Sequence, residues 1–309
     1  MSMVGEVRTS LVQTSAALDD DEVVAMLDLL PGRFVHRVSR PVPHAASPER
    51  FVGVDCFLAL PSRTVRAVGT VAHRTIVTGG HIIQGSATAE IRRGPDGRRL
   101  SWSHYLASPG RLETIGKGEP DDAARAFLDD AGDSPNVLDL GSVADQAIDS
   151  AQYDFADLDR RPPLRVPRGR VRWSAVFGSQ RPSARLRLEE GAIRSVSLLL
   201  PEGTDTAGAR AFCEDLALHD WLLTTVDHVV RRSGIGRRPS ATIVERLRPA
   251  IDHLLHLWSP GARRISPASE LWPAVEDATG LDQQWQTLIH RIRDQLALPA
   301  VSTSVREVA

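Results

Sequence analysis

Histidine–aspartate pairs in the last third of the chain are the residues whose types and spacing could do chemistry. His219 precedes Asp220, and Asp227 precedes His228, within one stretch that predicts a helix. Imidazole and carboxylate groups bind metals or transfer protons when their side chains converge on one point. At about 100° per residue, His219 and His228 face opposite sides of that helix. We interpret His219 as a hydrogen-bonded core histidine, and a site assembled from separate helices stays open.

A second group of this kind lies further along the chain, where Asp252 precedes His253 and His256 follows. Asp252 and His256 fall one helical turn apart on the polar side of a predicted helix, which is typical of a solvated pair. A phosphohydrolase built on the His–Asp dipeptide would also need a histidine on an earlier helix, and none lies between His104 and His219. We therefore predict no metal site and no cofactor. The catalytic candidates kept for an enzyme are His104, His219, Asp220 and His228.

Other reaction classes find little support in the sequence. Cys56 and Cys213 are the only cysteines and lack CxxC spacing, so we predict reduced core thiols. Lys117 is the only lysine, and its surroundings do not match the phosphate-binding GxxxxGK motif. No GxSxG, GxGxxG or HExxH motif occurs, so a serine hydrolase, a dinucleotide enzyme and a zincin are not indicated.

Charge is divided between two neighbouring blocks in the middle of the chain. Residues 119–159 carry many carboxylates and one arginine, Arg125, whereas residues 160–194 carry many arginines opposed by Glu189 and Glu190. The arginines could grip phosphates, but aromatic stacking positions are few among them. Pairing within the molecule or a partner-protein surface is therefore favoured. The interaction candidates in this block are Arg160, Arg161, Arg165, Arg168, Arg170 and Arg172.

A second arginine group follows the predicted helix over residues 205–234. Its members, which surround two glycines, are Arg231, Arg232, Arg237 and Arg238. They could form an anion pocket near the start of the next helix. A helix connection with a glycine stop and dipole-matching arginines explains the same residues, and we favour it. All four remain interaction candidates.

The helix over residues 205–234 must position most of these side chains. Apolar residues recur in it at steps of three and four, so one stripe contains Phe212, Leu216, His219, Leu223, Val226 and Val230. A polar side groups Asp220, Thr224, Asp227 and Arg231. Asp205 or Thr204 can cap the start of the helix, and Gly234 can adopt the left-handed stop.

Strand patterns dominate the first third of the chain. Residues 64–78, 81–93 and 98–107 predict an antiparallel meander with a Gly79–Gly80 turn, and residues 171–177, 184–189 and 193–200 predict three more strands. The predicted fold class is α+β, with an antiparallel β-rich N-terminal part, a mixed α/β middle part and a C-terminal helical bundle. The predicted boundaries are 1–118, 119–204 and 205–298, followed by a mobile tail over 299–309.

Several stretches carry a resemblance to a known family. They are WSHYL at 102–106, CEDLALHDWLL at 213–223 and RIRDQ at 291–295, accompanied by GEVRT at 5–9 and GVDC at 53–56. In them the chain resembles a family of uncharacterised proteins from high-GC, actinobacterial-type bacteria, over nearly its whole length. The resemblance implies a stable, self-contained protein, and it carries over no activity, ligand or catalytic residue.

Composition and motifs together favour a cytoplasmic, non-catalytic accessory or adaptor protein that acts through protein–protein contacts. The 309 residues have a formal net charge of −2, no leader and no apolar run of about 18 residues, so neither nucleic acid nor a membrane is an expected partner. Tryptophans that could be interface anchors or bundle core are Trp221, Trp258, Trp272 and Trp285. The alternative is an enzyme or small-molecule binder, metal-dependent or not, with a cleft between the β-rich part and the bundle. The pattern does not specify an oligomeric state.

Overall fold

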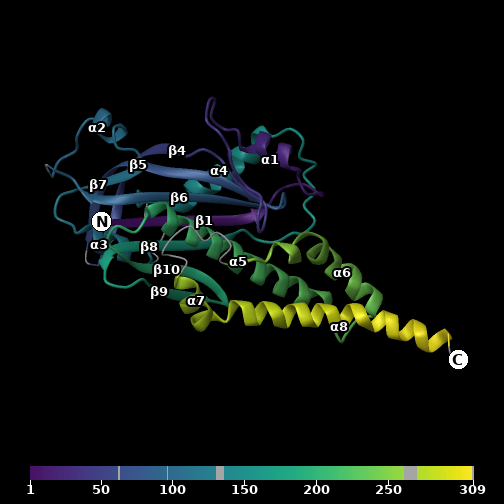
Figure 1. Ribbon diagram of the computed structural model, residues 1–309. Coiled ribbons are helices and arrows are strands. Elements are labelled where there is room, and N and C mark those ends of the chain that lie inside the picture. The colour runs from purple at the N-terminus through teal and green to yellow at the C-terminus, as the bar shows by residue number, and fades with distance from the viewer. Residues whose placement is uncertain (62, 96, 130–135, 261–269, 308–309) are drawn as a thin grey trace.

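The computed structural model describes residues 1–61, 63–95, 97–129, 136–260 and 270–307 of the chain. Its strands are β1 (Ser2–Leu11), β2 (His36–Val38), β3 (His44–Ala46), β4 (Arg50–Leu60), β5 (Arg63–Thr78), β6 (Ile82–Arg93), β7 (Arg111–Ile115), β8 (Gly169–Ser179), β9 (Ser183–Glu189) and β10 (Ala192–Pro201). Within the described residues, ten strands form one mixed sheet in the order β2-β3-β5-β7-β6-β1-β8-β10-β9, with β4 paired with β5 (Figure 1). The first strand of the chain therefore lies in the middle of the sheet, between β6 and β8.

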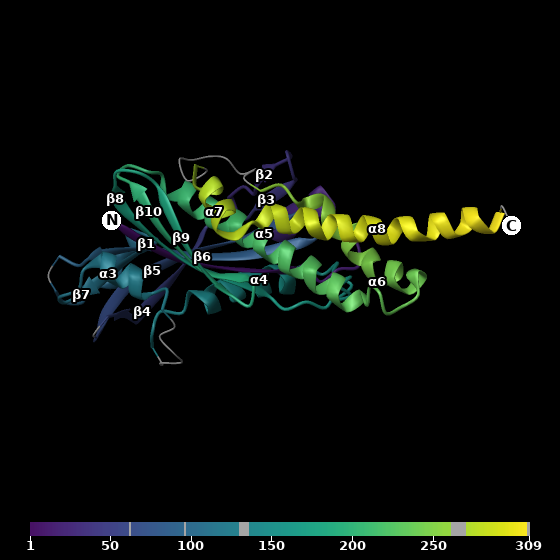
Figure 2. The same ribbon diagram turned by 90° about the horizontal axis from the view of Figure 1, so that it is seen from below.

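Helices cover both faces of this sheet. They are α1 (Asp20–Leu27), α2 (Trp102–Leu106), α3 (Pro120–Ala126), α4 (Leu140–Asp154), α5 (Thr206–Ser233), α6 (Ser240–His253), α7 (Trp272–Thr279) and α8 (Leu281–Glu307), with a short 3₁₀ helix, η1 (Leu255–Leu257). One face is covered by α3 and α4, and the other by α5, against which α6 and α8 pack from outside (Figures 1 and 2). Successive side chains of β1 point to opposite faces of the sheet, so this strand contributes to the hydrophobic core on each face. Val4 packs under α3 and α4, whereas Met3 and Val7 pack under α5.

The prediction of a long helix over residues 205–234 is confirmed by α5. The Asp205 side chain accepts the Ala207 N–H at 3.0 Å, and Gly234 ends the helix in the left-handed region with φ of 80°. Every member of the predicted apolar stripe is buried. The stripe faces the other helices, since Phe212 contacts the Trp272 ring and His219 contacts the Trp258 ring.

The opposite side of α5 packs on the sheet and includes buried polar groups among its apolar ones. Glu214 pairs with Arg74 of β5, and Asp220 Oδ1 accepts the Ile193 N–H of β10 at 2.9 Å. The sequence groups Asp220 with polar residues of one side, but its side chain is buried in the structure. The reason is that α5 lies between the sheet and the outer helices, so both of its sides need partners.

The β predictions are confirmed in part. Strands β5 and β6 form the predicted hairpin, and Gly79 and Gly80 both have positive φ. The turn is one residue longer than predicted, because the last pair, Thr78 with Ile82, leaves His81 in the turn as well. The strand predicted over residues 98–107 is wrong, because residues 102–106 form helix α2. The position that a third meander strand would take is occupied by β7, which pairs parallel with β6 and antiparallel with β5.

The middle strands also differ from a simple meander. The strand order is β8-β10-β9, so β10 lies between the other two and pairs parallel with β8. The fold is mixed α and β, with a β-rich N-terminal part and a helical C-terminal part, but its sheet is mixed and not purely antiparallel. Strand β1 joins the first and middle parts, since β8 pairs directly with it.

The C-terminal helices use the tryptophans in their own packing. Trp221 and Trp285 are buried, and Trp258 stacks on Trp285 with ring centroids 4.2 Å apart. The reading of these residues as bundle core therefore has direct support. Helix α8 continues beyond Pro299 to Glu307, whereas the sequence suggested a tail from residue 299. Residues 130–135 of the acidic block and residues 308–309 of that tail lie outside the described residues. None of the described helices combines the length and apolar character needed to cross a bilayer.

The buried Asp220 carboxyl predicts a pH dependence of stability. Burial raises its pKa to about 7, against the weaker opposing effects of the Ile193 N–H and Arg194. The folded chain then binds a proton that the unfolded chain releases near pH 4, so this group stabilises the fold at low pH and the stabilisation is lost as pH rises toward 7. The slope has an upper limit of about 1.4 kcal/mol per pH unit.

Replacement of Asp220 by Asn keeps an oxygen for the Ile193 N–H and removes the ionisation. We expect Asp220→Asn to gain stability relative to the wild type between about pH 4.5 and about pH 7.5. Urea unfolding at the two pH values measures the difference. A stability difference that is the same at both pH values would contradict the assignment.

Candidate functional site

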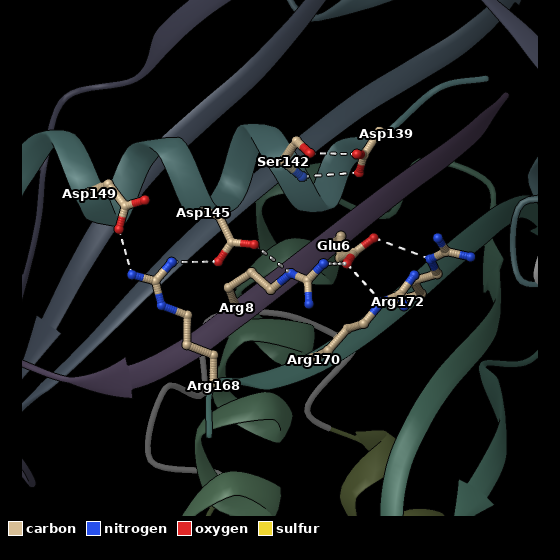
Figure 3. A network of polar contacts seen from close by, with 9 residues as sticks. All are labelled: Glu6, Arg8, Asp139, Ser142, Asp145, Asp149, Arg168, Arg170 and Arg172. Atoms are coloured by element: carbon tan, nitrogen blue, oxygen red, sulfur yellow. Dashed lines mark hydrogen bonds and ion pairs between the residues drawn. The ribbon is translucent and has the colours of Figure 1, made fainter. Parts of the chain in front are cut away.

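A buried carboxylate on the central strand pairs with two of the arginines predicted to interact, Arg170 and Arg172, and with Arg8 of its own strand. The Glu6 side chain is 1% exposed and lies between three guanidinium groups on one face of the sheet (Figure 3). Arg8 Nη2 and Arg170 Nε are each 2.9 Å from Glu6 Oε1, and Arg172 Nε is 3.2 Å from Glu6 Oε2. A buried carboxylate with three charge-assisted partners holds those arginines in place.

Strand register explains this gathering. In the antiparallel β1–β8 pair, Glu6 lies opposite Arg172 and Arg8 lies opposite Arg170, so all four side chains share one face. The first turn of α4 comes close to them at Gly141, where an added Cβ would overlap both Glu6 and Arg8. Sequence reasoning missed Glu6, because the first strand shows no sign of its later neighbours in β8.

The acidic and basic blocks pair within this molecule. Arg168 donates to Asp145 at 2.8 Å and also to Asp149, both on α4, and Arg8 Nε is 3.4 Å from Asp145 Oδ2 (Figure 3). Arg168, Arg170 and Arg172 therefore connect strands and helix of the same chain. Their side chains are only partly exposed, and their ion pairs hold the fold together and leave little of them for binding a partner.

The other interaction candidates divide into two kinds. Some have partners nearby: Arg160 donates to Gln152 O at 3.2 Å, the Arg161 N–H donates to Asp159, and Arg231 pairs with Asp227 at 2.6 Å. Arg237 and Arg238 are exposed in the turn between α5 and α6, where the Arg237 N–H donates to Gly234 O. This turn matches the helix connection favoured from the sequence.

The remaining candidates, Arg165 and Arg232, meet in a groove. The groove lies between the segment 163–166 and the facing parts of α5 and α6, with a volume of about 260 Å³. Its lining residues are Pro163, Leu164, Arg165, Val166, His228, Val229, Arg232, Ser233 and Arg246. We call this the arginine groove. It contains three arginines and one histidine, and no carboxylate belongs to its described lining.

The charges of the arginine groove are not neutralised. Among the described residues, no carboxylate forms an ion pair with Arg165, Arg232 or Arg246, in contrast to Arg168, Arg170 and Arg172. Arg246 Nη1 donates to the Arg232 carbonyl at 3.1 Å, and Arg232 Nη1 lies 3.4 Å from His228 Nε2. Three positive charges around one hollow favour an anionic ligand. Arg246 was missed from the sequence because no arginine cluster marks it.

The structure does not bring the four catalytic candidates together. His104, on α2, pairs with Glu113 at 2.9 Å. His219 Nδ1 donates to the Asp215 carbonyl at 2.7 Å and Nε2 accepts the Ser259 N–H at 3.1 Å, as expected of a core histidine. Asp220 points to β10 on the other side of α5, and His228 lines the arginine groove.

A second hollow, of about 140 Å³, lies between the start of α5 and strands β2, β3 and β5. Its basic groups have acidic partners: Arg74 pairs with the buried Glu214, and Arg210 pairs with Glu49. His36 and His44 also line it. None of the four catalytic candidates lines this hollow, so its polar lining does not include the residues that the sequence proposed for an enzyme.

Cysteine and histidine side chains elsewhere have packing roles. Cys56 and Cys213 are free and buried, and burial raises the pKa of the Cys56 thiol to about 12, so neither is an activated nucleophile. His81 Nε2 lies 3.2 Å from His253 Nδ1, where the β5–β6 turn meets the end of α6. In the part of the chain that the structure describes, no group of three or more His, Cys, Asp or Glu side chains is placed to hold a metal ion.

The Glu6 cluster predicts a large effect of a small change. Replacing Glu6 by Gln removes the negative charge that faces three guanidinium groups. Those three positive charges then have no carboxylate partner at this buried position. We expect Glu6→Gln to lower the free energy of unfolding by about 3 kcal/mol, the low end for a broken buried ion pair. Guanidinium unfolding measures the change.

Glu189→Gln is the matched control, because Glu189 pairs with Arg194 at 3.1 Å but is 68% exposed. We expect this control to cost less than about 1 kcal/mol. Equal effects of the two substitutions would show that the Glu6 cluster does not hold the sheet and α4 together.

Comparison with protein-family models, curated proteins and solved structures finds no match for this chain.

Proposed function

We propose that this chain is a cytoplasmic, non-catalytic accessory protein that docks an acidic partner protein at the arginine groove. The single observation that carries the proposal is the contrast between two sets of arginines. Arg168, Arg170 and Arg172 are paired with carboxylates of the same chain, whereas Arg165, Arg232 and Arg246 surround a hollow without ion pairs among the described residues.

Electrostatics supports an acidic partner over an uncharged one. Guanidinium groups bind carboxylates through paired N–H donors, and a cationic hollow attracts anions over a distance set by salt screening. The chain as a whole has a net charge of −2, so the positive potential is local to this groove. On a slightly acidic protein, a local cationic patch attracts an acidic partner to this groove and not to the rest of the surface.

The alternative function, an enzyme or small-molecule binder, is supported by the hollow at the start of α5. That hollow lies between the β-rich part and the helical part, where the alternative places its cleft. Its arginines are already paired with Glu214 and Glu49, and the four catalytic candidates are elsewhere. The arginine groove therefore has stronger support as the functional site.

The docking proposal predicts that charge reversal in the groove weakens binding to an acidic chain. Poly-L-glutamate labelled with a fluorophore serves as the probe, and fluorescence anisotropy measures its affinity. We expect the double variant Arg165→Glu, Arg232→Glu to bind at least about tenfold more weakly than the wild type. Binding by the wild type should also weaken as ionic strength rises from about 0.05 M to about 0.3 M.

The control is the double variant Arg185→Glu, Arg187→Glu, which changes the same charge on the exposed strand β9. It should keep nearly wild-type affinity. Equal losses in both double variants would mean that only net charge matters and that the groove is not the site. Tighter binding to a short DNA duplex than to poly-L-glutamate would favour nucleic acid over a protein partner.

A further inference from the structure

We propose that the arginine groove recognises a short acidic segment that seats one apolar side chain between its carboxylates. This inference rests on the proposed docking function and names the chemistry of the partner. It follows from a second property of the groove: its arginines are exposed, whereas its apolar residues are half-buried or buried, so we call the apolar residues its floor and the arginines its rim. The floor residues are Pro163, Leu164, Val166 and Val229.

The floor presents apolar surface that the fold itself does not fully cover. Leu164 and Val166 are partly buried and pack against the core cluster that includes the buried Val229 of α5. The volume of about 260 Å³ is below the range of about 300–1,000 Å³ typical of sites for drug-sized ligands. A groove of this size suits one bulky side chain of a segment and not a large cofactor.

The arginines of the rim come from three different elements around the apolar residues. Arg165 belongs to the segment 163–166, Arg232 to α5 and Arg246 to α6. A carboxylate before the seated apolar residue and one after it can therefore each meet a guanidinium group. Charge complementarity selects an acidic segment, and the floor selects an apolar residue within it.

The groove is built before any partner arrives. Pro162, Pro163 and Pro167 restrict the segment that carries Arg165, and Trp221 Nε1 of α5 donates to the Pro167 carbonyl at 3.2 Å. On the other wall, the bond from Arg246 to the Arg232 carbonyl ties α6 to the end of α5. Walls held in this way lower the entropic cost of ordering the site on binding.

The lining argues for a protein segment over a nucleic acid. Single-stranded nucleic acids bind where aromatic rings stack on successive bases along a cationic path. No Phe, Tyr or Trp belongs to the described lining of the groove, and its hydrophobic positions are aliphatic. Aliphatic floors accept apolar side chains and give a base no stacking partner.

Two peptides and two variants of the full chain test the inference. The probe peptide contains Asp-Glu-Leu-Glu-Asp between glycines, with a fluorophore at one end, and the second peptide has Ser in place of Leu. We expect the Leu peptide to bind the wild type about tenfold more tightly than the Ser peptide. Fluorescence anisotropy at fixed ionic strength measures both affinities.

Val166→Thr changes the floor at nearly constant shape, and Val244→Thr is the matched control on α6 outside the groove. Val166→Thr should reduce the preference for Leu over Ser by several fold, whereas the control should leave it unchanged. Circular dichroism confirms that both variants keep the fold.

The possible results separate the two proposals. Equal binding of both peptides, with loss of both in the Arg165→Glu, Arg232→Glu variant, would overturn the apolar seat and leave acidic docking in place. Binding of poly-L-glutamate without binding of either peptide would also overturn the seated segment. Failure of all three acidic probes to bind would overturn docking itself.

Discussion

One buried carboxylate constrains how this chain can be assembled. Glu6 lies on the central strand, and its side chain is almost fully buried. Because a buried carboxylate is costly without positively charged partners, the fold has to bring arginines to it. Its partners come from β1 itself and from β8, far away in the sequence, and the first turn of α4 fits over them at Gly141. This requirement links the N-terminal strand, the middle strands and α4 into one unit. It also determines which arginines become scaffold and which remain available.

A second buried ion pair fixes the long helix on the other face. Glu214 of α5 meets Arg74 of β5, and the Gln84 amide donates to the Glu214 carbonyl at 2.9 Å, so the helix is held to β5 and β6. The stripe that includes His219 then faces the outer helices and forms the core with their tryptophans. Because it packs on the sheet and on the outer helices, α5 is a central element of the fold. Its end, at Ser233, forms one wall of the arginine groove.

The parts of the structure that the sequence could predict are those set by local signals. The caps and stripe of α5 depend on neighbouring residues only, and they are confirmed. The turn at Gly79 and Gly80 is also set locally, although it is one residue longer than predicted. Placement that depends on distant neighbours could not be predicted. Residues 98–107 were expected to be a strand because nothing local shows that β7 takes the place beside β6. The arginine groove combines Arg165, Val229 and Arg246 from three separate elements, and no spacing in the sequence relates them.

Arginines of the same block, residues 160–194, differ in whether they pair with a carboxylate of this chain, and strand geometry explains the difference. From Gly169 onward the chain is strand β8, where alternate side chains point to the face that carries Glu6, so Arg170 and Arg172 are drawn into the buried cluster. Arg165 precedes the strand, on a proline-rich segment that lines the groove beside α5 and α6, and among the described residues no carboxylate pairs with it. A count of charges along the chain cannot separate these cases, because the same side chain stabilises the fold at one position and presents a binding surface a few residues away. The distinction depends on where the sheet begins.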